Sequence, residues 1–146
     1  MIEEAYVSYE TARLLQEKGF DETCYACYEY FSSGVTMYSG WPFEYKGEVV
    51  QNSKDRVKCP TQQMVMRWLR EVHHLHIEVE VLKPYDMNGG KRLKSTDRIE
   101  FHATIVHTDQ WNDALEEFKN EGIGWCETYE ECVEEAIKYC LEHLIE

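Results

Sequence analysis

The sequence predicts an α+β fold in which helices cover one face of an antiparallel sheet of about four strands. Two observations lead to this prediction. Several segments repeat apolar residues three and four positions apart, as a helix buried on one side does. Other segments alternate apolar and polar residues, as a strand with one face in water does. The predicted order is α-β-β-α-β-β-(α)-α, in a single domain that comprises residues 1–146.

The first predicted helix begins after Ser8, whose hydroxyl can accept a hydrogen bond from a free amide of the first turn. Helix-forming residues follow as far as Lys18. Gly19 should end the helix, because glycine readily takes the left-handed conformation that closes helices.

The second predicted helix starts at Pro60 or Thr61, since both residue types are common where a helix begins. Apolar side chains then recur at helical spacing, and this face should be buried. We expect Trp68 to anchor the core there. The predicted face consists of Met64, Trp68, Leu69 and Val72.

The third predicted helix carries the clearest pattern. Thr128 and Glu131 have the spacing of a capping box, in which each side chain can satisfy an amide of the first turn. A shorter helix is expected before it, over residues 109–120. The buried stripe of the third helix comprises Cys132, Val133, Ala136, Ile137, Cys140, Leu141, Leu144 and Ile145.

Two strands are predicted over residues 74–81 and 98–105, with Asn88-Gly89-Gly90 able to turn the chain between them. Weaker strand patterns cover residues 24–31 and 35–38. Residues 39–58 show no clear periodicity and are expected to form a long loop.

The positions of the apolar residues restrict the register of the second predicted hairpin. Both apolar sets lie at odd positions, so paired residue numbers must have an even sum. A loop centred on Gly89 gives a sum of 178, with a sum of 180 as the main alternative. The sum of 178 predicts the pairs His76 with His102, Glu78 with Glu100, and Glu80 with Arg98.

The net charge of −13 is unevenly distributed, because residues 109–146 hold twelve acidic side chains against two lysines. An acidic surface repels phosphate groups, so direct nucleic-acid binding is disfavoured. The acidic segment fits a solvated helix face. It also fits a surface that mimics nucleic acid or docks on a basic partner.

No apolar run approaches the roughly 20 residues that span a bilayer, and no signal peptide is recognisable at the N-terminus. The sequence therefore predicts a cytoplasmic protein that does not bind membranes. The six cysteines should then be reduced thiols.

Three segments look familiar together: YETARLLQEKGF at residues 9–20, PTQQMVMRWLREVH at residues 60–73, and YEE with AIKYCL at residues 129–141. In these, the chain resembles a group of small uncharacterised proteins carried by gut Bacteroidetes and by their phages or other mobile elements. The resemblance implies a bacterial cytosolic protein. It implies no chemistry and no functional residues.

Cys24 and Cys27 have the spacing of half a zinc knuckle, but a closed zinc site needs four ligands. Cys59, Cys126 or a histidine would have to complete the set. On a strand, positions 24 and 27 also point to opposite faces. We therefore predict no metal and no cofactor.

A histidine-rich strand face is a second candidate site, formed by His74, His76, Glu78 and His102. Such side chains can hold Zn²⁺, or serve as a general base with an orienting carboxylate. Histidine is also common on a partly exposed polar sheet face. A third candidate is a loop with Trp41 and Phe43, whose rings can anchor an interface or fold back onto the core.

The sequence contains none of the phosphate-binding, nucleophile-elbow or zinc-protease motifs that mark common enzymes. The leading interpretation is an accessory or regulatory protein of a mobile element that acts through protein–protein contacts. One alternative is a metal-dependent or hydrolytic enzyme that uses the histidine-rich strand face. The other is an acidic decoy that mimics nucleic acid.

Overall fold

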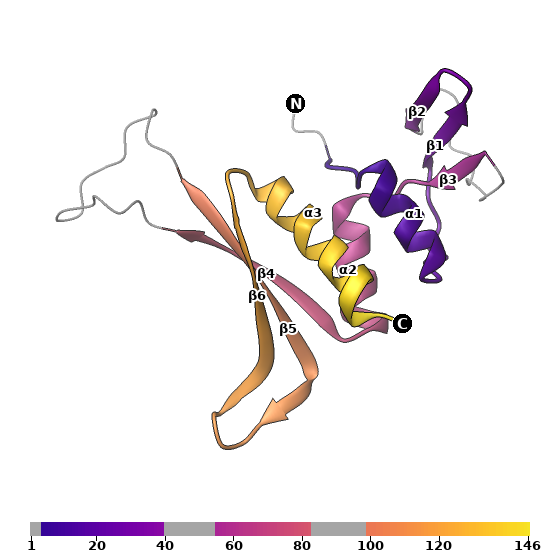
Figure 1. Ribbon diagram of the computed structural model, residues 1–146. Helices are drawn as coiled ribbons and strands as arrows, with labels where there is room; N and C mark the ends of the chain where they lie inside the picture. Colours follow the sequence, from indigo (N-terminus) through magenta and orange to yellow (C-terminus); the bar gives the residue numbers. More distant parts are fainter. Residues whose placement is uncertain (1–3, 40–54, 83–98) are drawn as a thin grey trace.

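The computed structural model describes residues 4–39, 55–82 and 99–146 (Figure 1). These residues form three α-helices and two three-stranded antiparallel sheets. The predicted α+β class is therefore confirmed. The prediction of one sheet of about four strands is wrong, because each half of the chain builds its own sheet.

The first sheet contains β1 (Ala26–Phe31), β2 (Gly34–Ser39) and β3 (Arg56–Lys58), in the order β2-β1-β3. The hairpin of β1 and β2 confirms the two weaker strand predictions. Strand β3 lies within the segment predicted to be a loop. A strand of three residues is too short to show an alternating pattern. Its conformation is stabilised by pairing with β1.

Helix α1 (Tyr9–Glu17) begins and ends where the sequence predicts. The Ser8 hydroxyl accepts a hydrogen bond from the amide of Thr11 at 3.2 Å. Gly19 follows the helix with φ +84°, a conformation that costs glycine little.

Helix α2 (Gln62–Val72) is capped by Thr61, whose hydroxyl accepts from the amide of Met64 at 3.2 Å. Trp68 and Leu69 are buried as predicted, but Val72 is 54% exposed. Val72 is the last residue of the helix and lies past its packed region. The fully buried Val65, one turn before Trp68, takes part in the core instead.

Helix α3 (Tyr129–Tyr139) continues as a π-helical turn, η1 (Cys140–Leu144). The Thr128 hydroxyl accepts from the amide of Glu131 at 3.1 Å, as the capping pattern predicts. The predicted stripe is buried from Cys132 to Leu141. Helix α3 packs against all three strands of the second sheet and against α1 and α2, so it is the centre of the core.

The second sheet contains β4 (Leu75–Leu82), β5 (Glu100–Asn112) and β6 (Glu117–Cys126), in the order β4-β5-β6. Helices α2 and α3 cover one of its faces (Figure 1). The helix predicted over residues 109–120 is wrong, because this segment is the far end of the β5–β6 hairpin. None of the helices in the described part of the chain is long and apolar enough to cross a bilayer.

The register of β4 and β5 keeps the predicted parity, since Ile77 pairs with Ile105. The register nevertheless differs from both predicted sums, because paired numbers sum to 182 and β5 is therefore shifted by two residues relative to the alternative sum of 180. The predicted Asn88–Gly90 turn lies outside the described residues. At the opposite end, the carbonyl of His74 accepts from the amide of Thr108 at 2.9 Å and so fixes this register.

Candidate functional site

The histidine-rich strand face does not gather into a site. His76 pairs with Val106, and His102 pairs with Glu80 on one side and Trp125 on the other. The predicted pairing of His76 with His102 is therefore wrong, as are the pairs Glu78 with Glu100 and Glu80 with Arg98. The two imidazoles lie on the same face but four positions apart along the strands, which is about 13 Å at the usual rise.

The remaining members of that face have separate environments. Glu78 faces Thr104 across the sheet, and its carboxylate approaches the His76 ring no closer than 3.9 Å. His74 occupies the turn between α2 and β4 with φ +56°, where its backbone rather than its ring makes the hydrogen bonds. Among the described residues, no histidine ring on this face lies within hydrogen-bonding distance of a carboxylate that could orient it as a base.

Cys24 and Cys27 are both buried, at 2% and 0% exposure. Cys59 lies near them, and burial raises the pKa of its thiol to about 12. Metal binding would require thiolates. Within the described residues, no three His, Cys, Asp or Glu side chains are grouped as metal ligands would be. Trp41 and Phe43 lie outside the part of the chain that the structure describes.

A projecting exposed feature of the described residues is the hairpin arm, which we define as residues 108–120. It consists of the end of β5, a turn and the start of β6, and it projects beyond the helices (Figure 1). Every residue in it is exposed. A register shift between Val106 and Trp111 separates it from the regular part of the sheet. The arm therefore contributes little to the core.

Three large apolar side chains are nevertheless exposed on this arm, and the β1–β2 hairpin exposes a comparable set: Tyr30, Phe31, Val35 and Met37. Trp111 pairs with Phe118 across the two strands, and their rings meet edge to face at 4.9 Å. Trp111 is 53% exposed, Leu115 in the turn is 66% exposed and Phe118 is 39% exposed. Exposed apolar side chains gathered in one place mark surfaces that other molecules cover.

Sequence reasoning missed this arm, although signals for it exist. Residues 104–108 are rich in β-branched side chains, which favour a strand, and Asn112-Asp113 is a common turn pair. In the structure, the Asn112 side chain accepts from the amides of Ala114 and Leu115 at 3.0 and 3.2 Å. Asn112 thus closes the turn that the helix prediction overlooked.

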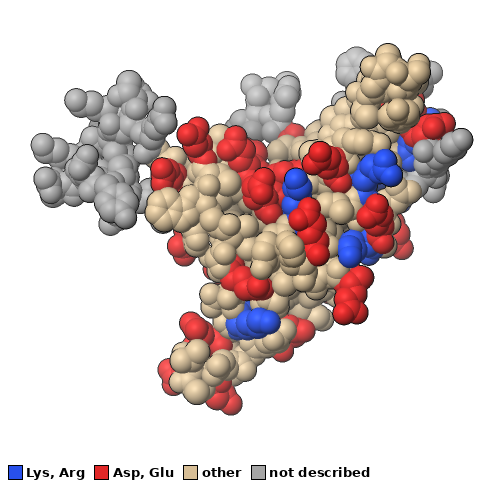
Figure 2. Space-filling view, viewed as in Figure 1, with Lys and Arg blue, Asp and Glu red and all other residues tan. Residues whose placement is uncertain are grey.

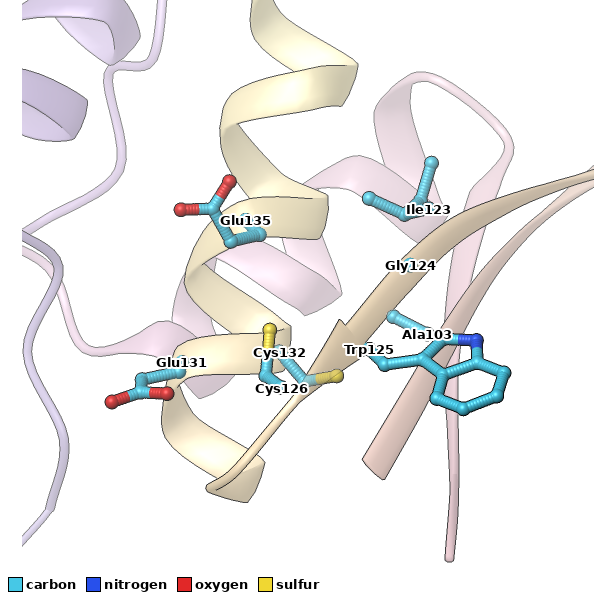
Figure 3. A pocket seen from close by; sticks show the side chains of 8 residues that line it. All are labelled: Ala103, Ile123, Gly124, Trp125, Cys126, Glu131, Cys132 and Glu135. Atoms are coloured by element: carbon cyan, nitrogen blue, oxygen red, sulfur yellow. The ribbon is translucent and has the colours of Figure 1, made fainter. Parts of the chain in front are cut away.

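A pocket of about 310 Å³ lies at the junction of β6 and α3 (Figure 3). The side chains of Cys126 and Cys132 both line it, with Trp125 on the strand side and Glu131 and Glu135 on the helix side. Comparison of the chain with protein-family models, with curated proteins and with solved structures finds no match. The arm and the pocket thus stand as candidate sites on geometry alone.

Proposed function

We propose that the protein is an accessory or regulatory factor that acts through protein–protein contacts, and that the hairpin arm binds the partner. The observation that carries this proposal is the exposed Trp111–Phe118 pair at the end of a projecting hairpin. Tryptophan and other aromatic side chains supply much of the binding energy of protein interfaces when a partner's pocket covers them.

The arm is preorganised for binding. Its ring pair is already in contact, the Trp111 indole donates to the Asp113 carboxylate at 2.8 Å, and the Asn112 side chain holds the turn. A rigid element loses less conformational entropy on docking than a flexible loop does. More of the energy gained by covering the two rings therefore appears as affinity.

The charges on the arm indicate what kind of partner fits it. Four acidic side chains surround the apolar tip, against one lysine: Asp109, Asp113, Glu116, Glu117 and Lys119. Figure 2 shows acidic side chains over much of the same face of the molecule. The complementary surface is an apolar socket on a partner protein with lysine and arginine around its rim, because charge complementarity speeds and directs association. A second copy of this chain, with its net charge of −13, would be repelled.

The test compares three tagged proteins as baits in an extract of the cells that encode the chain. These are the wild type, the double variant Trp111→Ala/Phe118→Ala, and Tyr30→Ala as a matched control. Tyr30 is an aromatic residue of the other hairpin and is 58% exposed. The wild type and Tyr30→Ala should capture the same protein, and the double variant should lose it.

The captured protein is then purified, and its binding is measured by calorimetry at low and high salt. Affinity should fall at least tenfold in the double variant, and it should fall as salt rises because the rim contacts are screened. Equal binding by all three baits would overturn the proposal. A wild-type dimer in sedimentation that the double variant abolishes would show instead that the arm binds a second copy.

A further inference from the structure

Cys126 and Cys132 bring two thiols together from different elements. Cys126 is the last residue of β6, and Cys132 follows the first turn of α3. The short connection between them contains the helix cap Thr128. Both side chains line the same pocket. Figure 3 shows both sulfur atoms at this junction.

The two thiols differ in their access to solvent. Cys126 is partly exposed, while the other five cysteines are buried. Cys132 is 1% exposed, and it can be approached through the pocket that both residues line. A reagent from solvent therefore meets Cys126 before Cys132.

We propose that Cys126 and Cys132 form a redox-responsive dithiol, which closes to an intramolecular disulfide when it meets a low-molecular-weight disulfide such as oxidised glutathione. This site goes beyond the proposed binding function of the arm and does not depend on it. In a reducing compartment the pair stays as two thiols. The disulfide between them forms when the concentration of small disulfides rises.

The exchange proceeds in two balanced steps. The Cys126 thiolate attacks one sulfur of the small disulfide, forms a mixed disulfide and releases one small thiol after protonation by water. Cys132 then gives its proton to solvent, attacks the Cys126 sulfur and displaces the second small thiol. The protein loses two hydrogen atoms in total, and the small disulfide is reduced to two thiols.

The surroundings favour this order of attack. Burial, and then the neighbouring Cys126 thiol, raise the pKa of Cys132 to about 11. A protonated thiol reacts slowly with reagents in solution. Once Cys126 carries the mixed disulfide, Cys132 lies beside it in the shared pocket, and this proximity compensates for its low thiolate fraction.

The test uses the full-length protein, reduced and freed of reductant without oxygen, with oxidised glutathione as the probe. Remaining thiols are then alkylated with N-ethylmaleimide under denaturing conditions, and intact mass and peptide mapping identify the products. The wild type should accumulate a protein with a disulfide between Cys126 and Cys132 and with the remaining thiols alkylated.

Single variants separate the two steps, with circular dichroism as the check on folding. In Cys132→Ala the reaction should stop at glutathione bound to Cys126, because the resolving thiol is missing. In Cys126→Ala no thiol should react at a comparable rate. The control variant Cys140→Ala removes another buried cysteine, just after α3. It should form the Cys126–Cys132 disulfide as the wild type does.

Dibromobimane on the wild type provides a measurement that needs no variant, since it becomes fluorescent when it bridges two neighbouring thiols. The bridge should map to Cys126 and Cys132. Three results would each overturn the proposal. They are full alkylation of the glutathione-treated wild type, a persistent mixed disulfide on wild-type Cys126, and a bimane bridge between other cysteines.

Discussion

The Nε2 atom of His107 lies 2.7 Å from Oε2 of Glu121, and His107 is buried between the second sheet and helix α3. The other oxygen of the same carboxylate accepts a hydrogen bond from the Tyr139 hydroxyl at 3.1 Å. The hydrogen bond from His107, and then that from Tyr139, lower the pKa of Glu121. This carboxylate thus joins β5, β6 and α3.

Replacing Glu121 with Gln should lower the free energy of unfolding by about 1–2 kcal/mol, because a charged hydrogen bond to a buried imidazole is lost. Since the pKa of Glu121 is lowered in the folded protein, its contribution is present above the ordinary value of 4.5 and is lost as pH falls below it. Urea unfolding at pH 7 and pH 4 measures both effects. Glu117→Gln on the exposed arm is the control, and equal losses in the two variants would contradict the assignment.

Trp68 should be the most costly truncation in helix α2. Its ring meets Phe20 edge to face at 5.2 Å and His73 at 4.6 Å, and it is 5% exposed. Trp68→Ala should reduce stability by about 3–5 kcal/mol, as truncation of a buried aromatic side chain does. Thermal unfolding provides the measurement, with the neighbouring exposed Arg67→Ala as the control. An unchanged midpoint in Trp68→Ala would mean that the ring does not hold the core.

The substitutions His76→Ala and His102→Ala should each be tolerated, with stability changes within about 0.5 kcal/mol, because both side chains are only half-buried, on the sheet face that the helices do not cover. The two rings are separated along the strands, so neither depends on the other. Calorimetric titration with Zn²⁺ should give the same result for the wild type and both variants. Zinc binding by the wild type that either substitution removes would restore the enzymatic alternative.

The sequence predicted those features of the fold that local chemistry determines. The caps at Ser8 and Thr128 and the buried stripe of α3 recur in the structure, because side-chain hydrogen bonds and three-four spacing act within a few residues. The odd-numbered apolar face that β4 and β5 share is predictable for the same reason. The absolute register depends on the turn that His74 forms between α2 and β4, which no local pattern records.

The hairpin arm illustrates the opposite case. Hydrophobic periodicity reports which face of an element is buried, and residues 108–120 bury neither face. Their acidic and polar residues therefore matched a solvated helix as well as a strand. That Cys126 and Cys132 line one pocket could not be predicted from the sequence either, because it depends on how β6 meets α3 rather than on cysteine spacing.

The buried thiols should make the folded protein sensitive to alkaline pH. Burial is the first cause that raises the pKa of four cysteines from the ordinary value of 9.0, to about 11 for Cys24 and Cys132 and to about 12 for Cys59 and Cys140. Burial also raises the pKa of the Tyr28 hydroxyl, which donates to the carbonyl of Val7 at 2.6 Å.

The sign of the effect follows from linkage. Above pH 9 the unfolded chain loses thiol protons that the folded chain keeps, so the unfolded state binds fewer protons and stability falls as pH rises. The stability contributed by these protonated thiols is fully present below the unfolded pKa. Each thiol can then cost about 1.4 kcal/mol per pH unit between its unfolded and folded pKa values.

Urea unfolding from pH 7 to pH 10, with a reductant present, measures this loss. The free energy of unfolding should be nearly constant up to about pH 8, where free thiols begin to ionise, and then fall steeply. Cys140→Ala should be less stable at neutral pH but show a shallower alkaline slope, because one titrating thiol is gone. Repeating the series at high salt separates this effect from repulsion among the surface carboxylates, which salt screens. A slope that high salt abolishes, or that Cys140→Ala leaves unchanged, would show that the buried thiols are not its source.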